Sequence, residues 1–205
     1  MICTYLETNF ILELAFAQEQ NESCKAILAL AESGTIKLVL PAFSFGECFE
    51  TLGRRIKEKN VLQTQINTQT KQLQRSQNYK RELQQLEDFT SLLVRINEED
   101  QNRLDSILSR MIGVSEIIPL DKDVVQVANL YRKQFKLQAQ DSIVFASIIS
   151  HLKSSKPSKR CFLNRNSRDF DDPDIRQALS DHDCKLLFDF DSGIQFISGH
   201  APHHP

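Results

Sequence analysis

Two patterns alternate along the chain: short runs that are apolar at nearly every position, and longer segments whose apolar residues recur every three or four positions. The short runs lie at 2–7, 36–40, 116–120, 160–164 and 184–188. Runs that are apolar on both faces are typical of strands in a buried parallel sheet. The segments with helical spacing lie at about 9–17, 20–33, 43 onward, 121–135, 139–153 and 173–181. This order predicts an α/β domain with right-handed crossovers between parallel strands.

Two helix ends are marked by their residues. Asp172 stands directly before Pro173, so we expect it to cap a helix whose first residue is the proline. Gly34 follows AILALAES, and a glycine at that place predicts the C-terminal end of the helix at 20–33.

Residues 54–113 break the alternation. They are rich in Gln, Lys, Arg and Glu and lack proline, which predicts an extended helical region. Steps of four and three, as in a coiled coil, connect Tyr79, Leu83, Leu86, Thr90, Leu93, Asn97, Asp100, Leu104, Ile107 and Met111. The spacing continues upstream at Leu62, Ile66, Gln69 and Leu73, and RSQN at 75–78 is a candidate bend. We therefore expect a long α-helical hairpin inserted into the α/β domain.

This division predicts an α/β domain at 1–53 and 114–198, a helical arm at 54–113 and a disordered tail at 199–205. Two interpretations of the arm remain open. It could be a solvated helix pair, because charge-rich helices are common without a partner, or it could be a surface for binding or for a homodimer.

The composition argues against several classes of protein. Of the 205 residues 40% are hydrophobic, and the formal charge is −2, so any contact with nucleic acid must come from local basic patches. The five cysteines form no Cys-x-x-Cys pair and lie in apolar segments, which favours buried reduced thiols over a zinc site. No stretch approaches the roughly 18 apolar residues that a membrane span requires. We therefore expect a cytoplasmic protein without a membrane partner.

Polar residues stand where the predicted strands end, and ligands of open parallel α/β sheets gather at that edge. These residues are Glu7, Glu47, Asp141, Asn164, Asn166 and Asp169. Converging carboxylates repel one another unless a cation compensates, and oxygen ligands favour a hard divalent ion such as Mg²⁺ or Mn²⁺. Such an ion activates water and clamps a phosphoryl group, so phosphodiester hydrolysis is the chemistry that this arrangement predicts.

Each of these residues also has a purely structural explanation. Glu47 stands three residues after Ser44 at a helix start, as in a capping box. Asp141 could complement the positive end of its helix, and Asn164, Asn166 and Asp169 could be turn residues. Glu7 has the weakest structural explanation, because a carboxylate that closes a buried strand is unfavourable unless it is paired or metal-bound.

The motifs resemble those of the PIN-domain nucleases, small α/β proteins that are typically metal-dependent ribonucleases. YLETNFILEL looks like the opening strand, acidic residue, Thr-Asn and helix of the family. LVLPAFSFGECFETL is similar to its strand, proline and helix-borne Glu, and AQDSIVFASII to its helix that opens with Asp. CFLNRNSRDF resembles the late strand and the loop that supplies a fourth polar ligand. The resemblance implies a three-layer α/β/α domain.

The resemblance also implies a site. Glu7, Glu47 and Asp141 would be the catalytic carboxylates and would hold Mg²⁺ or Mn²⁺. The fourth metal ligand would be Asn166, or Asp169 if the loop is one residue longer. Supporting polar residues would be Thr8, Asn9 and Asn164. Where this chain has Glu7, the family usually has Asp.

The leading hypothesis is therefore a metal-dependent endoribonuclease, toxin-like in the sense that the family includes toxins with small antitoxin partners. The RNA is expected to be bound by Arg54, Arg55, Lys57, Arg165 and Arg168, or by the loop KSSKPSKR at 153–160. Such a basic loop is more often only a solvated turn. The alternative is a catalytically weak module that binds RNA or a protein through the helical arm, which the glutamate at position 7 and the neutral amide of Asn166 favour. Another phosphoryl-transfer enzyme is disfavoured, because Glu7 replaces the Asp nucleophile expected at the first strand end.

Overall fold

The computed structural model describes residues 1–75, 80–155 and 159–200. Its elements follow one another as β1 (Ile2–Tyr5), α1 (Thr8–Ala15), α2 (Asn21–Glu32), β2 (Ile36–Pro41), α3 (Ala42–Leu73), α4 (Lys80–Val114), β3 (Ser115–Ile118), α5 (Lys122–Gln134), α6 (Ala139–Ser154), β4 (Lys159–Leu163), α7 (Ser167–Phe170), α8 (Pro173–Ser180), β5 (Cys184–Leu187) and α9 (Phe190–Ser198). All five predicted strands are present. The short α7 and the longer α9 are additions that the apolar periodicity did not predict.

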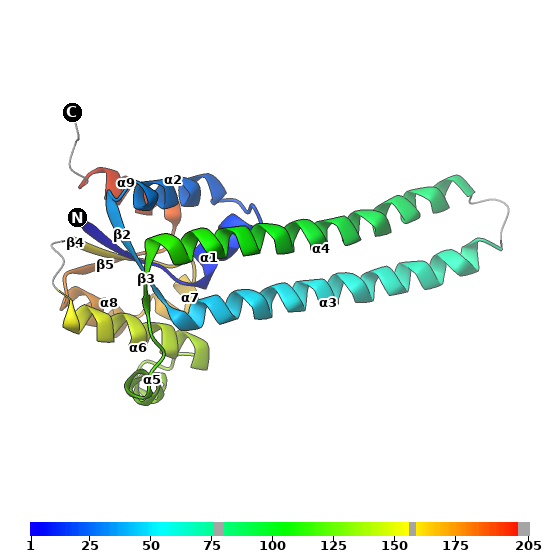
Figure 1. The fold of residues 1–205 in the computed structure, drawn as a ribbon. Helices are drawn as coiled ribbons and strands as arrows, with labels where there is room; N and C mark the ends of the chain where they lie inside the picture. Colours follow the sequence, from blue (N-terminus) through cyan, green and yellow to red (C-terminus); the bar gives the residue numbers. More distant parts are fainter. Residues whose placement is uncertain (76–79, 156–158, 201–205) are drawn as a thin grey trace.

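The five strands form one parallel sheet in the order β3-β2-β1-β4-β5 (Figure 1). Strand β1 is central, with Ile2 paired to Ile36 of β2 on one side and to Lys159 of β4 on the other. The chain builds the sheet outward from β1 in one direction and then crosses back to β4. The point between β1 and β4 is therefore the topological switch point, where ligands bind at the carboxyl ends of the strands.

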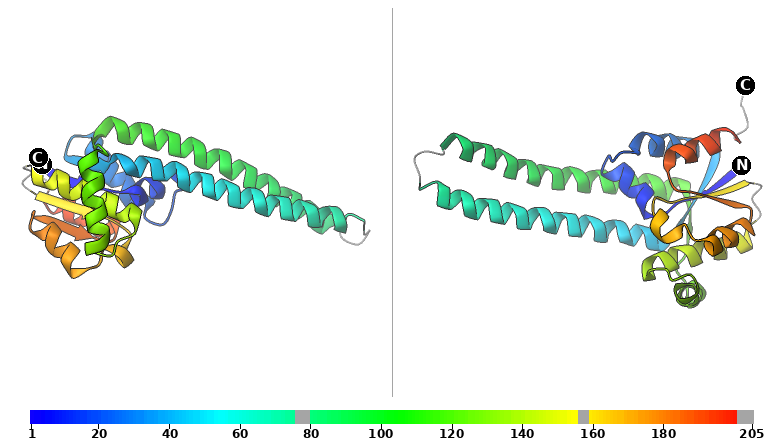
Figure 2. Two further views of the ribbon diagram at one scale, coloured as in Figure 1. Left: turned by 90° about the horizontal axis from the view of Figure 1, so that it is seen from below. Right: turned by 180° about the vertical axis from the view of Figure 1, so that it is seen from behind.

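Helices cover both faces of the sheet, as the two further views in Figure 2 show. One core cluster joins Ile2 and Leu38 to the apolar faces of α1, α2 and α9. The other joins Cys3 and Val39 to α6 and α8. Neighbouring strand residues thus point into opposite layers, which explains why the strands are apolar at nearly every position. The predicted three-layer α/β/α arrangement is confirmed.

The helix ends follow the predicted chemistry. The Asp172 side chain accepts a hydrogen bond from the Asp174 N–H at the start of α8, with Pro173 at the first helical position. Gly34 has φ +73° just after α2, a conformation that glycine adopts without a Cβ penalty. At Gly193 in α9 a Cβ would lie 2.7 Å from Leu163 Cδ1, so this glycine lets α9 approach β4 closely.

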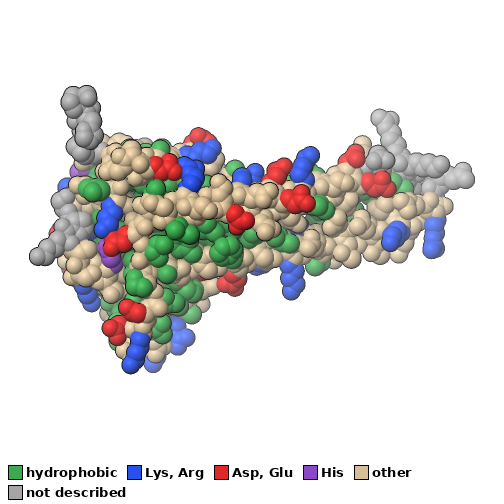
Figure 3. Space-filling view, in the orientation of Figure 1, with side chains coloured by type: hydrophobic (Ala, Val, Ile, Leu, Met, Phe, Trp, Pro, Cys, Tyr) green, Lys and Arg blue, Asp and Glu red, His purple; other side chains and the backbone are tan. Residues whose placement is uncertain are grey.

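The long helices α3 and α4 pack side by side as a hairpin that projects from the sheet domain (Figures 1 and 3). The predicted seam of α4 is confirmed at the positions whose side chains are described, with Leu83, Leu93 and Leu104 buried. Tyr79 lies outside the described residues.

On α3 the predicted seam is wrong at three of its four positions. Leu62 and Leu73 are each 41% exposed and Gln69 is exposed as well, so these three do not form the contact with α4. Ile66 is partly buried as predicted, and it packs together with Leu52, Ile56, Lys59, Gln63 and Thr70. Because α3 is one continuous helix from Ala42, its packing at the sheet domain determines which face meets α4, and the local apolar pattern of the distal half does not.

A polar network lies within the hairpin. Asp100 is buried and pairs with Lys59 (Nζ to Oδ2, 2.9 Å) and with Arg103 (Nη2 to Oδ1, 2.7 Å). The Arg103 Nε also donates to the Ala15 carbonyl at the end of α1, 2.9 Å away. Through this contact the base of the arm is attached to the helix that follows Glu7.

The five cysteines are buried and free, and burial raises their thiol pKa values. In the predicted tail, Gly199 and His200 continue from α9, with a 2.8 Å hydrogen bond between His200 Nδ1 and the Phe196 carbonyl, and residues 201–205 lie outside the described part. Within the described ranges, no helix combines the length and apolar character needed to cross a membrane.

Candidate active site

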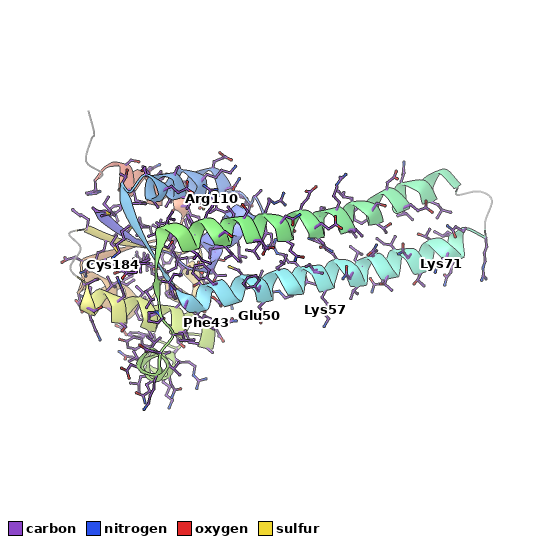
Figure 4. All side chains as sticks on the ribbon, viewed as in Figure 1. Phe43, Glu50, Lys57, Lys71, Arg110 and Cys184 are labelled. Atoms are coloured by element: carbon purple, nitrogen blue, oxygen red, sulfur yellow. The ribbon has the colours of Figure 1, made fainter. Side chains whose placement is uncertain are left out.

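A polar cleft of about 410 Å³ opens at the carboxyl end of the central strand, between α1, α3 and α6. Its walls are formed by Glu7, Thr8, Asn9, Leu12, Gln18, Glu47, Glu50, Thr51, Arg54, Arg55, Gln140, Asp141, Val144 and Phe170. Glu50, labelled in Figure 4, lies one turn beyond Glu47 at the base of α3. Three of the predicted carboxylates, Glu7, Glu47 and Asp141, thus reach one cleft from three distant segments of the chain.

Glu7 caps α1 from the end of β1. Its Oε2 accepts a hydrogen bond from the Asn9 N–H at 3.1 Å, and the residue is only 8% exposed. Its Oε1 is buried and has no hydrogen-bond partner among the described residues. Burial raises the pKa of Glu7 to about 8, and the negative charges of Glu47 and Asp141 add to this effect.

Glu47 lies in the second turn of α3 and accepts a hydrogen bond from the Thr8 hydroxyl through its Oε2. Burial raises the pKa of its carboxyl, and the neighbouring Asp141 and Glu50 raise it further. The capping-box explanation is wrong, because α3 begins at Ala42 with Pro41 as its N-cap.

Asp141 lies in the first turn of α6, where its pKa is raised by burial and then by the charge of Asp169. The Asn166 side-chain amide donates to both carboxylates, to Asp141 Oδ1 at 3.2 Å and to Asp169 Oδ2 at 2.7 Å. Asn164 is buried, and its Oδ1 accepts from the Asn166 N–H at 2.6 Å, which orients the loop after β4. The amide of Asn166 therefore bridges the two acids.

The predicted residues form two adjoining groups. Glu7, Thr8, Asn9, Glu47 and Asp141 line the cleft itself. The other three, Asn164, Asn166 and Asp169, join it through the hydrogen bond to Asp141. Across the described ranges, no three His, Cys, Asp or Glu side chains lie close enough together to hold a metal ion. The donors nevertheless suit a hard divalent cation, since all are oxygen atoms and the buried Oε1 of Glu7 lacks a partner.

The predicted RNA-binding residues differ in position. Arg54 and Arg55 line the cleft, and the Arg55 guanidinium lies 4.0 Å from the centre of the Phe16 ring. Lys57 is exposed on α3 and points away from α4 in Figure 4, outside the cleft. Arg168 is exposed on α7. In the loop at 153–160, residues 156–158 lie outside the described part.

Arg165 instead forms ion pairs within the chain. It pairs with Glu13 of α1 and, through Nη2 at 3.3 Å, with Glu19. Glu13 is 1% exposed, and its Oε2 also accepts from the Gln20 N–H at 2.9 Å. Glu13 was not among the predicted site residues, although its place within the apolar helix segment FILELA was a signal for it. The ion pair joins α1 to the loop that carries Asn164 and Asn166.

We expect Arg165→Met to lower the free energy of unfolding by about 2 kcal/mol, because it leaves the buried Glu13 carboxylate without its cation. This loss of stability is smaller than the loss expected on breaking a fully buried ion pair, because the Arg165 side chain is a third exposed to solvent. Urea denaturation would measure the change. Arg168→Met, at an exposed site of α7 just after this loop, is the matched control and should change the stability by less than about 0.5 kcal/mol. Equal effects of the two variants would contradict the importance of the ion pair.

Comparison with known proteins agrees with the geometry. A family model described as PIN domain matches residues 4–170, which include the whole cleft and the predicted site carboxylates Glu7, Glu47, Asp141 and Asp169. No curated protein and no solved structure matches the chain. Since the matched region covers most of the chain, this protein belongs to the PIN-domain family.

Proposed function

We propose that this protein is an endoribonuclease that hydrolyses RNA phosphodiester bonds with Mg²⁺ or Mn²⁺. The observation that carries the proposal is the convergence of Glu7, Glu47 and Asp141 on one cleft at the end of the central strand. PIN domains are generally nucleases and are typically dependent on divalent metals. The raised pKa values of all three carboxyls add support, because acids held together in a buried cleft are typical of cation and catalytic sites.

Glu7, Glu47 and Asp141 would hold the ion, with Asn166 or Asp169 as the fourth ligand. When bound, the ion supplies an activated water and compensates charge on the phosphodiester. The chain's own residues prepare the cleft for it. The Asn9 N–H and the Thr8 hydroxyl orient the carboxylates of Glu7 and Glu47, and the Asn166 amide orients Asp141.

The RNA backbone would lie beside the cation site. Arg54 and Arg55 line the same cleft, so their guanidinium groups can bind phosphates next to the carboxylates. Phe16 lies under Arg55 and holds it by a cation–π contact. RNA as substrate is consistent with the family, whose members often bind RNA.

A cleavage assay with purified protein tests the proposal. Labelled single-stranded RNA of mixed sequence is incubated with Mn²⁺, Mg²⁺ or EDTA. We expect cleavage with either metal and none with EDTA. Absence of cleavage under all three conditions, with the protein shown to be folded, would overturn the proposal.

The second candidate is a catalytically weak module that binds RNA or a protein partner. Two observations favour it. The Oε2 of Glu47 already accepts a hydrogen bond from the Thr8 hydroxyl, and the fourth site offers the neutral amide of Asn166. RNA binding without cleavage in any metal would support it. A cytoplasmic location and an antitoxin-like partner stay predictions.

A further inference from the structure

An apolar groove lies at the base of the hairpin, on the side of α3 away from the cleft. It has a volume of about 570 Å³, and its apolar wall is formed by Ala42, Phe45, Phe49, Leu108, Ile112 and Ile117. Phe49 and Ile112 are 54% and 56% exposed. Figure 3 shows hydrophobic side chains gathered along this face, where the two long helices leave the sheet domain. Contiguous exposed apolar surface of this kind marks an interaction site.

The two helices that border the groove carry opposite charges on this face. One side of α4 carries Ile112, Asp105, Glu98 and Glu87. Successive members of this set are seven, seven and eleven residues apart, which are spacings close to whole numbers of helical turns. On α3, Lys57 and Lys71 are spaced by fourteen residues and lie on the Phe49 side. All five charged residues are exposed.

Among the described residues, no ion pair engages these side chains. The face therefore consists of a basic ridge on α3, an acidic ridge on α4 and an apolar groove between them at the base.

We propose that this face, defined by Phe49, Ile112 and the five flanking charges, binds the same face of a second copy of the chain. A twofold axis running along the hairpin places α3 of each copy against α4 of the other, so that basic and acidic ridges meet. An axis across the hairpin would instead place α4 against α4 and bring like charges together. Charge complementarity thus selects one of the two arrangements. The product is an antiparallel four-helix bundle.

The register of the hairpin identifies the pairs. Lys59 lies opposite Asp100, and Asn60 opposite Asn97. When this antiparallel register is continued, Lys71 and Glu87 lie at the same height along the hairpin axis, and Lys57 lies within about one turn of the height of Glu98. A twofold axis parallel to the hairpin leaves the height of every residue along that axis unchanged. Lys71 of one copy therefore meets Glu87 of the second copy, near the end of the bundle.

The size of the face is sufficient for a dimer. From Phe45 to Leu73, α3 spans about 43 Å, and two adjacent helices are about 20 Å wide. The face thus measures on the order of 850 Å², comparable with the roughly 800 Å² per partner of a stable interface. The groove and the cleft lie on different sides of α3, since Thr51, Arg54 and Arg55 line the cleft. The dimer is therefore independent of the proposed nuclease activity.

A charge-swap experiment with the full chain tests this arrangement. Sedimentation equilibrium at low salt should show a dimer of the wild type at micromolar concentrations. Lys71→Glu should weaken the dimer on the order of tenfold or more, because it faces Glu87 of the second copy. The double variant Lys71→Glu/Glu87→Lys should restore the affinity. Lys25→Glu, an exposed lysine of α2 outside this face, should leave the affinity unchanged.

Phe49→Lys gives a second measurement that does not depend on the exact pairing. Because Phe49 is more than half exposed, the variant should fold normally, as judged by circular dichroism, and should be a monomer. A wild type that is monomeric at these concentrations would overturn the proposal. A dimer that survives both Phe49→Lys and Lys71→Glu would overturn it as well, since another surface would then hold the two copies together.

Discussion

Asp141→Asn is expected to reduce metal-dependent RNA cleavage by about 10²- to 10³-fold or more while the protein remains folded. The substitution removes one charged oxygen from the proposed cation site and keeps the size of the side chain. The amide oxygen can still accept from the Asn166 side chain, which now donates to the carboxylate at 3.2 Å. The variant also relieves the repulsion between Asp141 and Asp169. The loss should therefore be in activity and not in stability.

The matched control is Asp172→Asn. It makes the same chemical change at the N-cap of α8, where Asn caps nearly as well as Asp. Cleavage rates of both variants would be measured with Mn²⁺ and RNA in excess, and thermal unfolding would confirm the folding of each. Retention of more than about a tenth of wild-type activity by Asp141→Asn would contradict its assigned role.

Glu7→Gln is expected to stabilise the metal-free protein at alkaline pH. The folded-state pKa of Glu7 is raised to about 8, above the ordinary value of 4.5. Below about pH 4.5 both folded and unfolded states hold the proton, and the wild type keeps its full stability. Between these two values the unfolded chain loses the proton and the native state retains it. The free energy of unfolding of the wild type therefore falls as pH rises toward 8.

The glutamine side chain has no titratable proton, so the free energy of unfolding of the variant does not fall with rising pH through this site. We expect the stability of Glu7→Gln to exceed that of the wild type by on the order of 4 kcal/mol at about pH 8.5 and by less than about 1 kcal/mol at about pH 5. Urea denaturation in EDTA at both pH values would measure this. Glu22→Gln, at an exposed carboxylate of α2, should show no such difference.

Mn²⁺ provides the complementary measurement for the same variant. An ion that binds only the native state should raise the stability of the wild type more than that of Glu7→Gln. An equal stability of the two proteins at both pH values would mean that Glu7 is not held as a buried, protonated carboxyl. An equal response to Mn²⁺ would exclude Glu7 as a ligand.

Much of the fold could be predicted because its causes are local. A strand in a sheet covered on both faces is apolar throughout, so each strand was visible as a short run. Asp172 with Pro173 and Gly34 act on adjacent backbone groups, and both helix ends are where these residues predicted them. The helix α9 was not predicted, since its packing depends on the contact of Gly193 with Leu163, a residue far away in the sequence.

The candidate site, too, was predictable in part from the sequence and in part was not. The sequence by itself determined which polar residues follow the strands, and parallel strand order then predicted their convergence, because the carboxyl ends of parallel strands share one edge. Only the tertiary structure decided what each of them contacts. It placed Glu47 beside Thr8 and not in a capping box, joined Asp141 to Asp169 through Asn166, and paired Arg165 with the buried Glu13. Side-chain partners, burial and pKa shifts depend on segments brought together from distant parts of the chain, and no local pattern encodes them.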